Sequence, residues 1–206
     1  MSALDDLPPP VSAADHVRGA HDAPVTIIEY GDFACPSCKQ AAPAVLLQIR
    51  RFHGRVRFAF RHFPLDEFHA NALIAAEASE AAAAQGRFWE MHDQLFANQR
   101  RLHRDLLRQL AEALELDMQR FSKELKDRVH LPRIRRNGAE GRHLGIRSTP
   151  TFYINGALCD VTFGLLPFRH AVEKALWRNE DRSIVRPIAY SDAPMRDADT
   201  AKRHFV

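Results

Sequence analysis

Residues 25–38 read VTIIEYGDFACPSC, an apolar run that passes through a short connector into a pair of cysteines. Residues 25–30 have the length and apolar content of a short buried strand, and a helical pattern begins at Pro36. Cys35 therefore stands at the start of a helix, where free backbone N–H groups and the positive helix end favour thiolate over thiol. Cys38 follows within reach on the same face, so the pair can form a disulfide and exchange electrons with other disulfides.

The Cys-x-x-Cys spacing alone leaves other interpretations open. It also serves zinc sites, but those usually need a second pair of ligands, and we expect no metal here. An inert pair of thiols is the remaining alternative. The chain has three cysteines, so Cys159 stays outside the pair. A lone cysteine on a presumed strand is usually a small buried hydrophobic residue, with a regulatory thiol as the alternative.

A second informative stretch, residues 147–156, reads RSTPTFYING, which predicts a turn, a strand and an Asn-Gly turn. Pro150 heads the strand, where it cannot donate a hydrogen bond to a neighbouring strand. This position makes sense if the Thr149–Pro150 bond is cis and the preceding backbone is unpaired. An ordinary turn proline is the alternative.

Together, a strand–Cys-x-x-Cys–helix unit and a distant Thr-Pro strand form the pattern of the thioredoxin superfamily. In detail the chain resembles the DsbA-like thiol–disulfide oxidoreductases. The resemblance rests on residues 25–38, 61–65, 85–93 and 145–156 and runs from about residue 16 to about residue 180. It implies an α/β, thioredoxin-like fold with an inserted all-helical subdomain that forms a lid. It also implies a redox-active cysteine pair that needs no metal or organic cofactor.

Four parts are expected along the chain. Residues 1–20 look like a flexible N-terminal arm, residues 21–65 and 145–180 form the thioredoxin-like base, and residues 66–144 form the helical insertion. Residues 181–206 are a tail, either disordered or packed on a partner. Residues 55–60 alternate as a strand, Pro43 is expected to kink the first helix, and Pro167 suits the first turn of the last helix. In the insertion we expect helices over residues 70–85, 88–96 and 102–114, one capped by Asp117, and one leading to Leu144.

The candidate catalytic residues are Cys35, Cys38 and Glu29. Cys35 is the nucleophile, and Cys38 is the resolving thiol that attacks the mixed disulfide. Glu29 is an acid in an apolar strand and matches the buried acid of the resembled family. Burial would raise its pKa and let it relay a proton to or from Cys38. A glutamate that faces solvent from an edge strand is the alternative.

The candidate substrate-binding residues are Pro36, Ser37, Thr149 and Pro150. The resemblance implies that an extended substrate pairs with the backbone at Thr149. Strongly oxidising members of the family carry a histidine where this chain has Ser37. A hydroxyl brings no positive charge, so we expect a reduction potential between those of the reductants and the strong oxidants. Among the histidines, His62 and His69 are candidates to line the cleft, whereas His92 is expected to pack or cap.

Composition argues against several partners. The net charge is +3 and the basic residues are scattered among acidic ones, so no nucleic-acid footprint appears. No run approaches the roughly 18 apolar residues of a membrane span. Residues 1–10 lack the basic and apolar regions of a secretory signal, so a cytoplasmic location is expected. Thiols stay reduced there, and a Cys-x-x-Cys pair is more often catalytic than structural.

The function that these features favour is protein-disulfide oxidoreduction with protein or small-molecule thiols through a mixed disulfide, with glutathione as a candidate partner. Two alternatives belong to other classes. A thioredoxin-fold module that binds peptides or acts as a chaperone would need Pro150 but would tolerate loss of Cys38. A glutathione-dependent transferase or isomerase of related fold would need no second active-site cysteine. The sequence does not name the substrate, the net direction of electron flow or the oligomeric state.

Overall fold

One mixed β-sheet forms the centre of the computed structural model, which describes residues 7–161 and 164–184. Its strands lie in the order β1-β3-β2-β4-β5. The parallel pair β2–β3 is central, and the other neighbours are antiparallel. The strands are β1 (His16–Arg18), β2 (Val25–Gly31), β3 (Val56–His62), β4 (Thr151–Ile154) and β5 (Ala157–Cys159).

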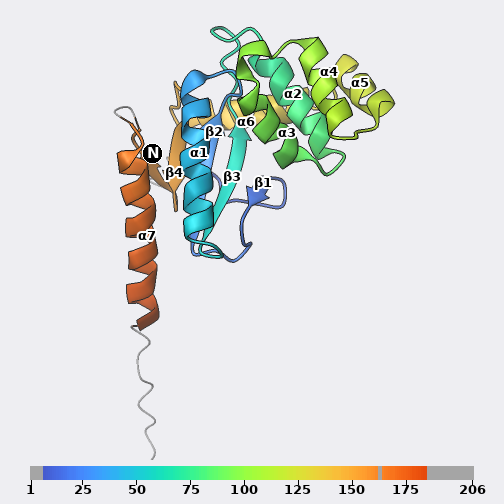
Figure 1. Ribbon diagram of the computed structural model, residues 1–206. Helices are drawn as coiled ribbons and strands as arrows, with labels where there is room; N and C mark the ends of the chain where they lie inside the picture. The colour runs from blue at the N-terminus through green and yellow to red at the C-terminus, as the bar shows by residue number, and fades with distance from the viewer. Residues whose placement is uncertain (1–6, 162–163, 185–206) are drawn as a thin grey trace, which may run out of the picture.

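Helices cover both faces of the sheet (Figure 1). On one face, α1 (Pro36–Arg51) and α7 (Leu166–Ile184) contact the strands and each other. Pro43 lies inside α1, which continues through it. The other face carries Tyr30 and Phe63, and α6 (Leu131–His143) packs against it. The approach is close, since a Cβ atom at Gly141 of α6 would lie 2.6 Å from the Phe63 ring.

The remaining helices gather at one end of the sheet (Figure 1). They are α2 (Ala72–Ala83), α3 (Phe88–Ala97), the short 3-10 helix η1 (Gln99–Arg101), α4 (Arg104–Ala113) and α5 (Met118–Lys126). Alanine-rich α2 is buried over most of its length and contacts α3, α4, α5 and α6. Asp117 caps α5 as the sequence predicts, because its carboxylate accepts a hydrogen bond from the Arg120 N–H.

The structure differs from the predicted organisation at three places. Residues 16–18 of the predicted arm form β1, because the edge of β3 offers free backbone groups for pairing. Helix α6 lies in the predicted insertion but covers the sheet, since an apolar face needs a second layer. Helix α7 runs past residue 180 to Ile184, and the rest of the predicted tail lies outside the described residues.

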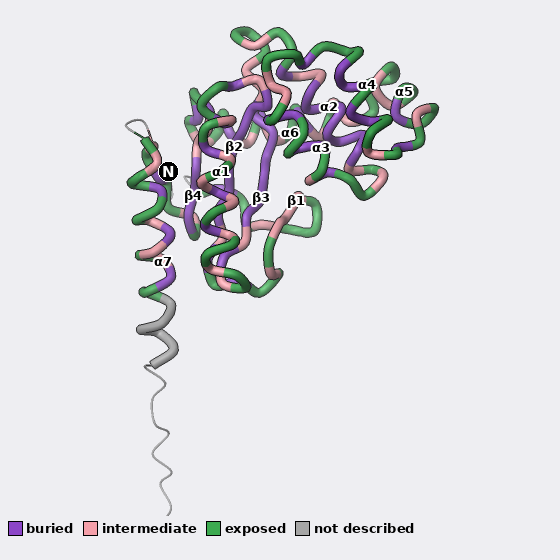
Figure 2. Tube along the Cα trace, in the orientation of Figure 1, coloured by how far each residue is buried: buried purple, intermediate pink, exposed green. Residues whose placement is uncertain are grey.

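Strand β2 sets the position of the site. Side chains alternate along a strand, so Val25, Ile27 and Glu29 share one face while Ile28 and Tyr30 occupy the other. The first face is the one that α1 and α7 cover, and Figure 2 shows that β2 and β3 are buried along most of their length. Glu29 is therefore held beneath the helix that carries the cysteines. No helix among the described residues has the length and apolar character needed to cross a membrane.

Candidate active site

The two cysteines lie at the first turn of α1. Cys35 is the N-cap residue in an extended conformation, and Pro36 occupies the first helical position. Both thiols are buried, with Cys35 6% exposed and Cys38 0% exposed. The Cys38 sulfur accepts a hydrogen bond of 3.5 Å from the Asp32 N–H. Pro36 is exposed on the surface beside them, as is Ser37.

The surroundings give the two thiols opposite pKa shifts. A hydrogen bond from the Cys38 thiol, joined by backbone N–H groups of Cys38 and Ser37, lowers the pKa of Cys35 to about 5, although burial opposes the shift. Burial raises the pKa of Cys38 well above its usual value. These opposite shifts favour a thiolate at Cys35 and a thiol at Cys38 near neutral pH.

Glu29 lies on the central strand β2 and is only 2% exposed, so it is not a solvent-facing glutamate of an edge strand. Burial, followed by the negative charge of Cys35, raises the pKa of Glu29 to about 8, while a hydrogen bond with Cys38 acts in the opposite direction. Its Oε1 atom has no hydrogen-bond partner among the described residues. The carboxyl group is thus in contact with the Cys38 thiol, and its pKa lies close to neutral pH.

The Thr149–Pro150 peptide bond is cis, as the sequence predicts. Thr149 is buried, and its carbonyl oxygen lies 3.2 Å from the Cys35 sulfur, which donates to it as a thiol. The Asn-Gly turn after β4 also forms, with Asn155 and Gly156 both at positive φ. The structure thus brings Thr149 and Pro150 to the cysteine pair from more than a hundred residues away in the sequence.

Asp32 is a site residue that sequence reasoning missed. Its buried carboxylate accepts hydrogen bonds from the N–H groups of Ala34, at 2.7 Å, and Leu65, at 3.1 Å. His69 Nδ1 lies 2.7 Å from the same carboxylate. His69, a candidate for the cleft, therefore lies close to the active-site segment as the partner of Asp32. An acidic residue in a predicted connector gave no signal for this role.

Gln99 is a second residue that the sequence did not reveal. Its side-chain amide, on η1 of the insertion, donates to the carbonyl oxygens of Phe33 and Cys35, each at 2.8 Å. The insertion thereby holds the backbone at Cys35. A contact between residues more than sixty positions apart leaves no local pattern in a single sequence.

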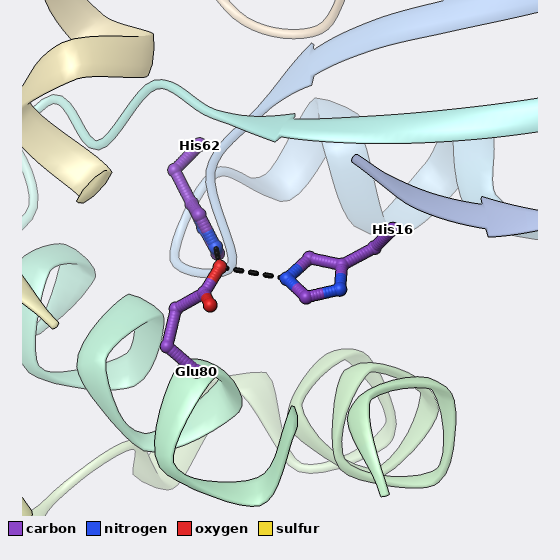
Figure 3. A group of neighbouring side chains, drawn as sticks. All are labelled: His16, His62 and Glu80. Carbon is purple, nitrogen blue, oxygen red and sulfur yellow. Dashed lines mark hydrogen bonds and ion pairs between the residues drawn. The ribbon is translucent and has the colours of Figure 1, made fainter. Parts of the chain in front are cut away.

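A separate polar cluster lies where β1, β3 and α2 meet (Figure 3). One oxygen of the Glu80 carboxylate lies 2.8 Å from His16 Nε2 and 2.7 Å from His62 Nε2, and accepts a hydrogen bond of 2.7 Å from Arg133 Nε. Burial by itself would raise the pKa of Glu80, but the hydrogen bonds to His16 and His62 lower it strongly. His62, the other candidate for the cleft, is instead buried against Glu80.

The spacing of His16, His62 and Glu80 would allow a metal ion, and no other group of described residues has it. Two observations argue against a metal. The Arg133 guanidinium already supplies a cation at the carboxylate. His62 Nδ1 is buried without a partner, whereas a metal-bound histidine normally donates its second ring N–H. We therefore interpret the cluster as a structural link between the N-terminal segment, the sheet and the insertion.

The other two candidates lie apart from the cysteine pair. His92 on α3 is buried among aromatic side chains, with Phe33, Phe60 and Phe96 packing edge to face against its ring. Cys159 is buried on the edge strand β5 opposite Phe152, and burial raises its pKa.

Comparison with solved structures identifies a common fold. The oxidised form of BdbD from Bacillus subtilis superposes with a TM-score of 0.71 at 25% sequence identity, covering 85% of this chain and 95% of BdbD. Wolbachia pipientis alpha-DsbA1 has a TM-score of 0.70 at 23% identity, covering 84% of this chain and 96% of that one. The second match shows the fold alone.

Curated relatives match over a shorter part of their length. A Na(+)/H(+) antiporter NhaA 3 of Salinispora tropica is 49% identical over 153 residues, or 73% of this chain and 23% of the relative. A Na(+)/H(+) antiporter NhaA 1 of Mycobacterium sp. (strain KMS) is 40% identical over 146 residues, covering 69% of this chain and 24% of the relative. The matched part of the chain thus spans about a quarter of the length of these relatives.

A family model described as thioredoxin matches residues 12–174, which include both cysteines, Glu29 and the cis proline. This range covers most of the chain and agrees with the fold and with the structural matches. The chain belongs to the thioredoxin superfamily, in its DsbA-like family.

Proposed function

We propose that the protein is a thiol–disulfide oxidoreductase that exchanges electrons with protein thiols and disulfides through Cys35 and Cys38. The feature that carries the proposal is the Cys-x-x-Cys pair at the start of α1 beside the cis Thr149–Pro150 bond, where the surroundings shift the pKa values of the two thiols in opposite directions. Cys35 has a pKa of about 5, and the pKa of Cys38 is raised by burial. A thiolate beside a protonated thiol is suited to two successive exchange steps.

In the first step, the Cys35 thiolate attacks one sulfur of a substrate disulfide. A Cys35–substrate disulfide forms, the substrate S–S bond breaks, and the second substrate sulfur leaves as a thiolate. In the second step, Cys38 attacks Cys35, the Cys35–Cys38 bond forms, and the remaining substrate sulfur leaves with the electron pair. Two electrons pass from the cysteine pair to the substrate, and the reverse sequence oxidises a substrate dithiol.

Glu29 is proposed as the base of the second step. Cys38 must lose its proton as it attacks, and Glu29 is in hydrogen-bond contact with it. A carboxyl with a pKa of about 8 changes protonation near neutral pH, so it can take up this proton and return it in the reverse direction. The cysteine pair and Glu29 require no metal or organic cofactor for these steps, and that absence stays a prediction.

The substrate is proposed to lie across Thr149 and Pro150, with Pro36 and Ser37 on the opposite side. The Thr149 carbonyl contacts the Cys35 sulfur, so an extended backbone paired there would bring its own sulfur to the nucleophile. Protein or peptide substrates are therefore favoured. Use of glutathione and the cytoplasmic location stay predictions.

Reduction of insulin and oxidative refolding of a reduced protein test the proposal. Cys35→Ser should abolish both activities, whereas Cys159→Ser, the matched control, should keep them. Cys38→Ala should accumulate mixed disulfides with client proteins on non-reducing gels, because the resolving attack is lost.

Other outcomes would favour the alternatives. Peptide binding that survives loss of both cysteines, without electron transfer, would indicate a binding or chaperone module. Activity that needs glutathione but not Cys38 would indicate a transferase or isomerase. An alkylation rate for Cys35 with its inflection near pH 8.5, the usual value for a free thiol, would contradict the proposed thiolate.

A further inference from the structure

A cavity of about 250 Å³ lies between α1 and α3 and reaches the sheet at Glu29. Its walls are largely apolar and include Leu46, Phe58 and Phe96. Glu29 and His92, both buried, also line it. The volume is sufficient for several water molecules, each of which occupies about 30 Å³ in the liquid.

Each of these two buried side chains has one polar atom without a partner among the described residues. The atoms are Glu29 Oε1 and His92 Nε2. Leaving a buried polar atom unpaired costs about 1–3 kcal/mol, so two such atoms around one cavity call for a common explanation. Water between them would supply hydrogen bonds to both.

The second ring nitrogen of His92 points to the surface. Nδ1 lies 2.8 Å from the carboxylate of Asp93, whose side chain is 53% exposed. A carboxylate only accepts hydrogen bonds, so Nδ1 carries the proton and Nε2 is left with a lone pair. Burial lowers the pKa of His92, which favours this neutral form. The imidazole therefore has a proton acceptor at the buried end and a proton donor at the exposed end.

Charged or titratable groups from β1, α1, α3 and β3 surround the space between Glu29 and the exposed side of His92. Arg18 of β1 donates to Asp93 at 2.9 Å, and Lys39 of α1 also lines the cavity. On the inner side, Cys35 and Cys38 face Glu29. His62 of β3 lies close enough to His92 to oppose its protonation. The outer end of this space is thus polar, and the inner end is the reaction site.

With a pKa of about 8, Glu29 is largely protonated at neutral pH, so it must lose a proton before it can accept the proton of Cys38 in the second exchange step. Because Glu29 is buried, this proton needs a route to solvent. Water is a much weaker base than the Glu29 carboxylate, so direct transfer of the proton from Glu29 to water is slow. A base near Glu29 would speed this proton transfer.

We propose that His92 is a proton-relay residue that acts through Glu29, with water in the cavity carrying the proton between Glu29 and His92 Nε2. The imidazole accepts that proton at Nε2 and releases the proton on Nδ1 to Asp93 and then to solvent. When the pair is reduced again, Cys38 regains a proton that moves inward by the same route. One proton out and one in per cycle restore the starting tautomer of His92.

This inference rests on the proposed function, and one stopped-flow experiment separates the two. The reduced protein is mixed with one equivalent of an aromatic disulfide that releases coloured thionitrobenzoate. The first release reports attack by Cys35, and the second reports attack by Cys38. Absence of the first release would contradict the proposed function, whatever His92 does.

The variant His92→Gln keeps a polar side chain but cannot relay a proton, and His16→Gln serves as a matched control because His16 is a half-buried histidine outside the cavity. We expect His92→Gln to slow the second release about tenfold and to leave the first release unchanged. This slowing is smaller than the roughly 100-fold or greater contribution of a general acid or base that acts directly. His16→Gln should change neither. A second release at the wild-type rate in His92→Gln would overturn the relay.

Rescue by buffer distinguishes a relay from a packing role. Imidazole added to His92→Ala should accelerate the second release in proportion to its concentration and leave the first unchanged, because free imidazole can enter the space and carry the proton. Ala42→Leu, which fills the cavity and keeps His92, provides an independent test and should also slow the second release alone. A His92→Ala rate that does not respond to imidazole, or an Ala42→Leu variant with wild-type rates, would contradict the proposal.

Discussion

Two glutamates, Glu29 and Glu80, are buried to nearly the same extent, yet their pKa values shift in opposite directions. Glu29 lies beside two sulfur atoms, and its pKa rises to about 8. Glu80 lies among two histidines and an arginine, and its pKa falls. The degree of burial is the same, so the partners determine whether the carboxyl carries a charge.

Glu29 titrates near neutral pH, whereas Glu80 does not. The Glu80 carboxylate stays ionised through the neutral range and links three parts of the fold. Glu29 has no positive partner among the described residues, so the protonated and ionised forms of its carboxyl are close in free energy near neutral pH. A proton relay needs an environment like that of Glu29, and a structural ion cluster needs one like that of Glu80.

The largest expected effect is on the pH dependence of stability. Because folding raises the pKa of Glu29 from 4.5 to about 8, ionising it in the folded protein costs roughly 5 kcal/mol relative to the unfolded chain. Wild-type stability should fall as pH rises through this window, and Glu29→Gln should remove that loss. Denaturant unfolding of the reduced proteins at several pH values measures it. A constant difference between wild type and variant would show that Glu29 does not titrate there.

Glu80→Gln should give the opposite pH dependence. At neutral pH we expect a loss of about 3 kcal/mol in the free energy of unfolding, since the substitution removes the carboxylate charge beside the Arg133 guanidinium and the oxygen that pairs with His16 and His62. A lowered pKa contributes stability above the unfolded value of 4.5, and this stability is lost as pH falls toward the folded value. The deficit of the variant should therefore shrink at acid pH. A deficit that grows at acid pH would contradict the assignment.

The two glutamates should also differ in kinetics. Glu29→Gln should slow the second release of thionitrobenzoate about a hundredfold, because the variant has no base for the Cys38 proton. Glu80→Gln should keep that rate within about twofold, once both variants are shown to be folded by circular dichroism. Equal slowing in the two variants would mean that the effect comes from packing and not from proton transfer.

The smallest expected effect comes from giving the cysteine site a positive partner like those around Glu80. Ser37→His should make the pair more oxidising by about 30 mV, or about 1.4 kcal/mol, through one charge-assisted contact with the Cys35 thiolate. Equilibration in glutathione buffers measures the potential, and alkylation against pH measures the pKa of Cys35. The pKa should fall in the same variant. A rise in potential at constant pKa would refute thiolate stabilisation as its cause.

Much of the fold follows from local patterns. The apolar run before Cys35, the alternation of residues 55–60 and the apolar spacing of the insertion predict β2, β3 and α2–α5 to within a few residues. Strand β1 and the position of α6 were not predicted, because both depend on contacts with the sheet and not on a local sequence pattern. A three-residue strand forms where an edge is open, and α6 covers a face that the sequence of the helix itself does not reveal.

The candidate site divides in the same way. Cys35, Cys38, Glu29, Thr149 and Pro150 carry a signal, because a helix start, an acid in an apolar strand and a proline at a strand head are each local anomalies. Asp32 and Gln99 carry none, since what matters is their contact with distant backbone groups. The sequence predicts a packing or capping role for His92, and only its place beside a cavity shared with Glu29 points to a role in proton transfer.

The sequence alone determined where the two cysteines, the acid and the proline belong, because strand alternation, helix starts and turn chemistry depend on residues close along the chain. Only the tertiary structure decided the ionisation of each group. Glu29 and Glu80 both stand among apolar neighbours in the sequence, and nothing local distinguishes them. Their charge depends on which polar and charged atoms the fold brings next to each carboxyl, because electrostatic and hydrogen-bond energies in a buried site depend strongly on distance.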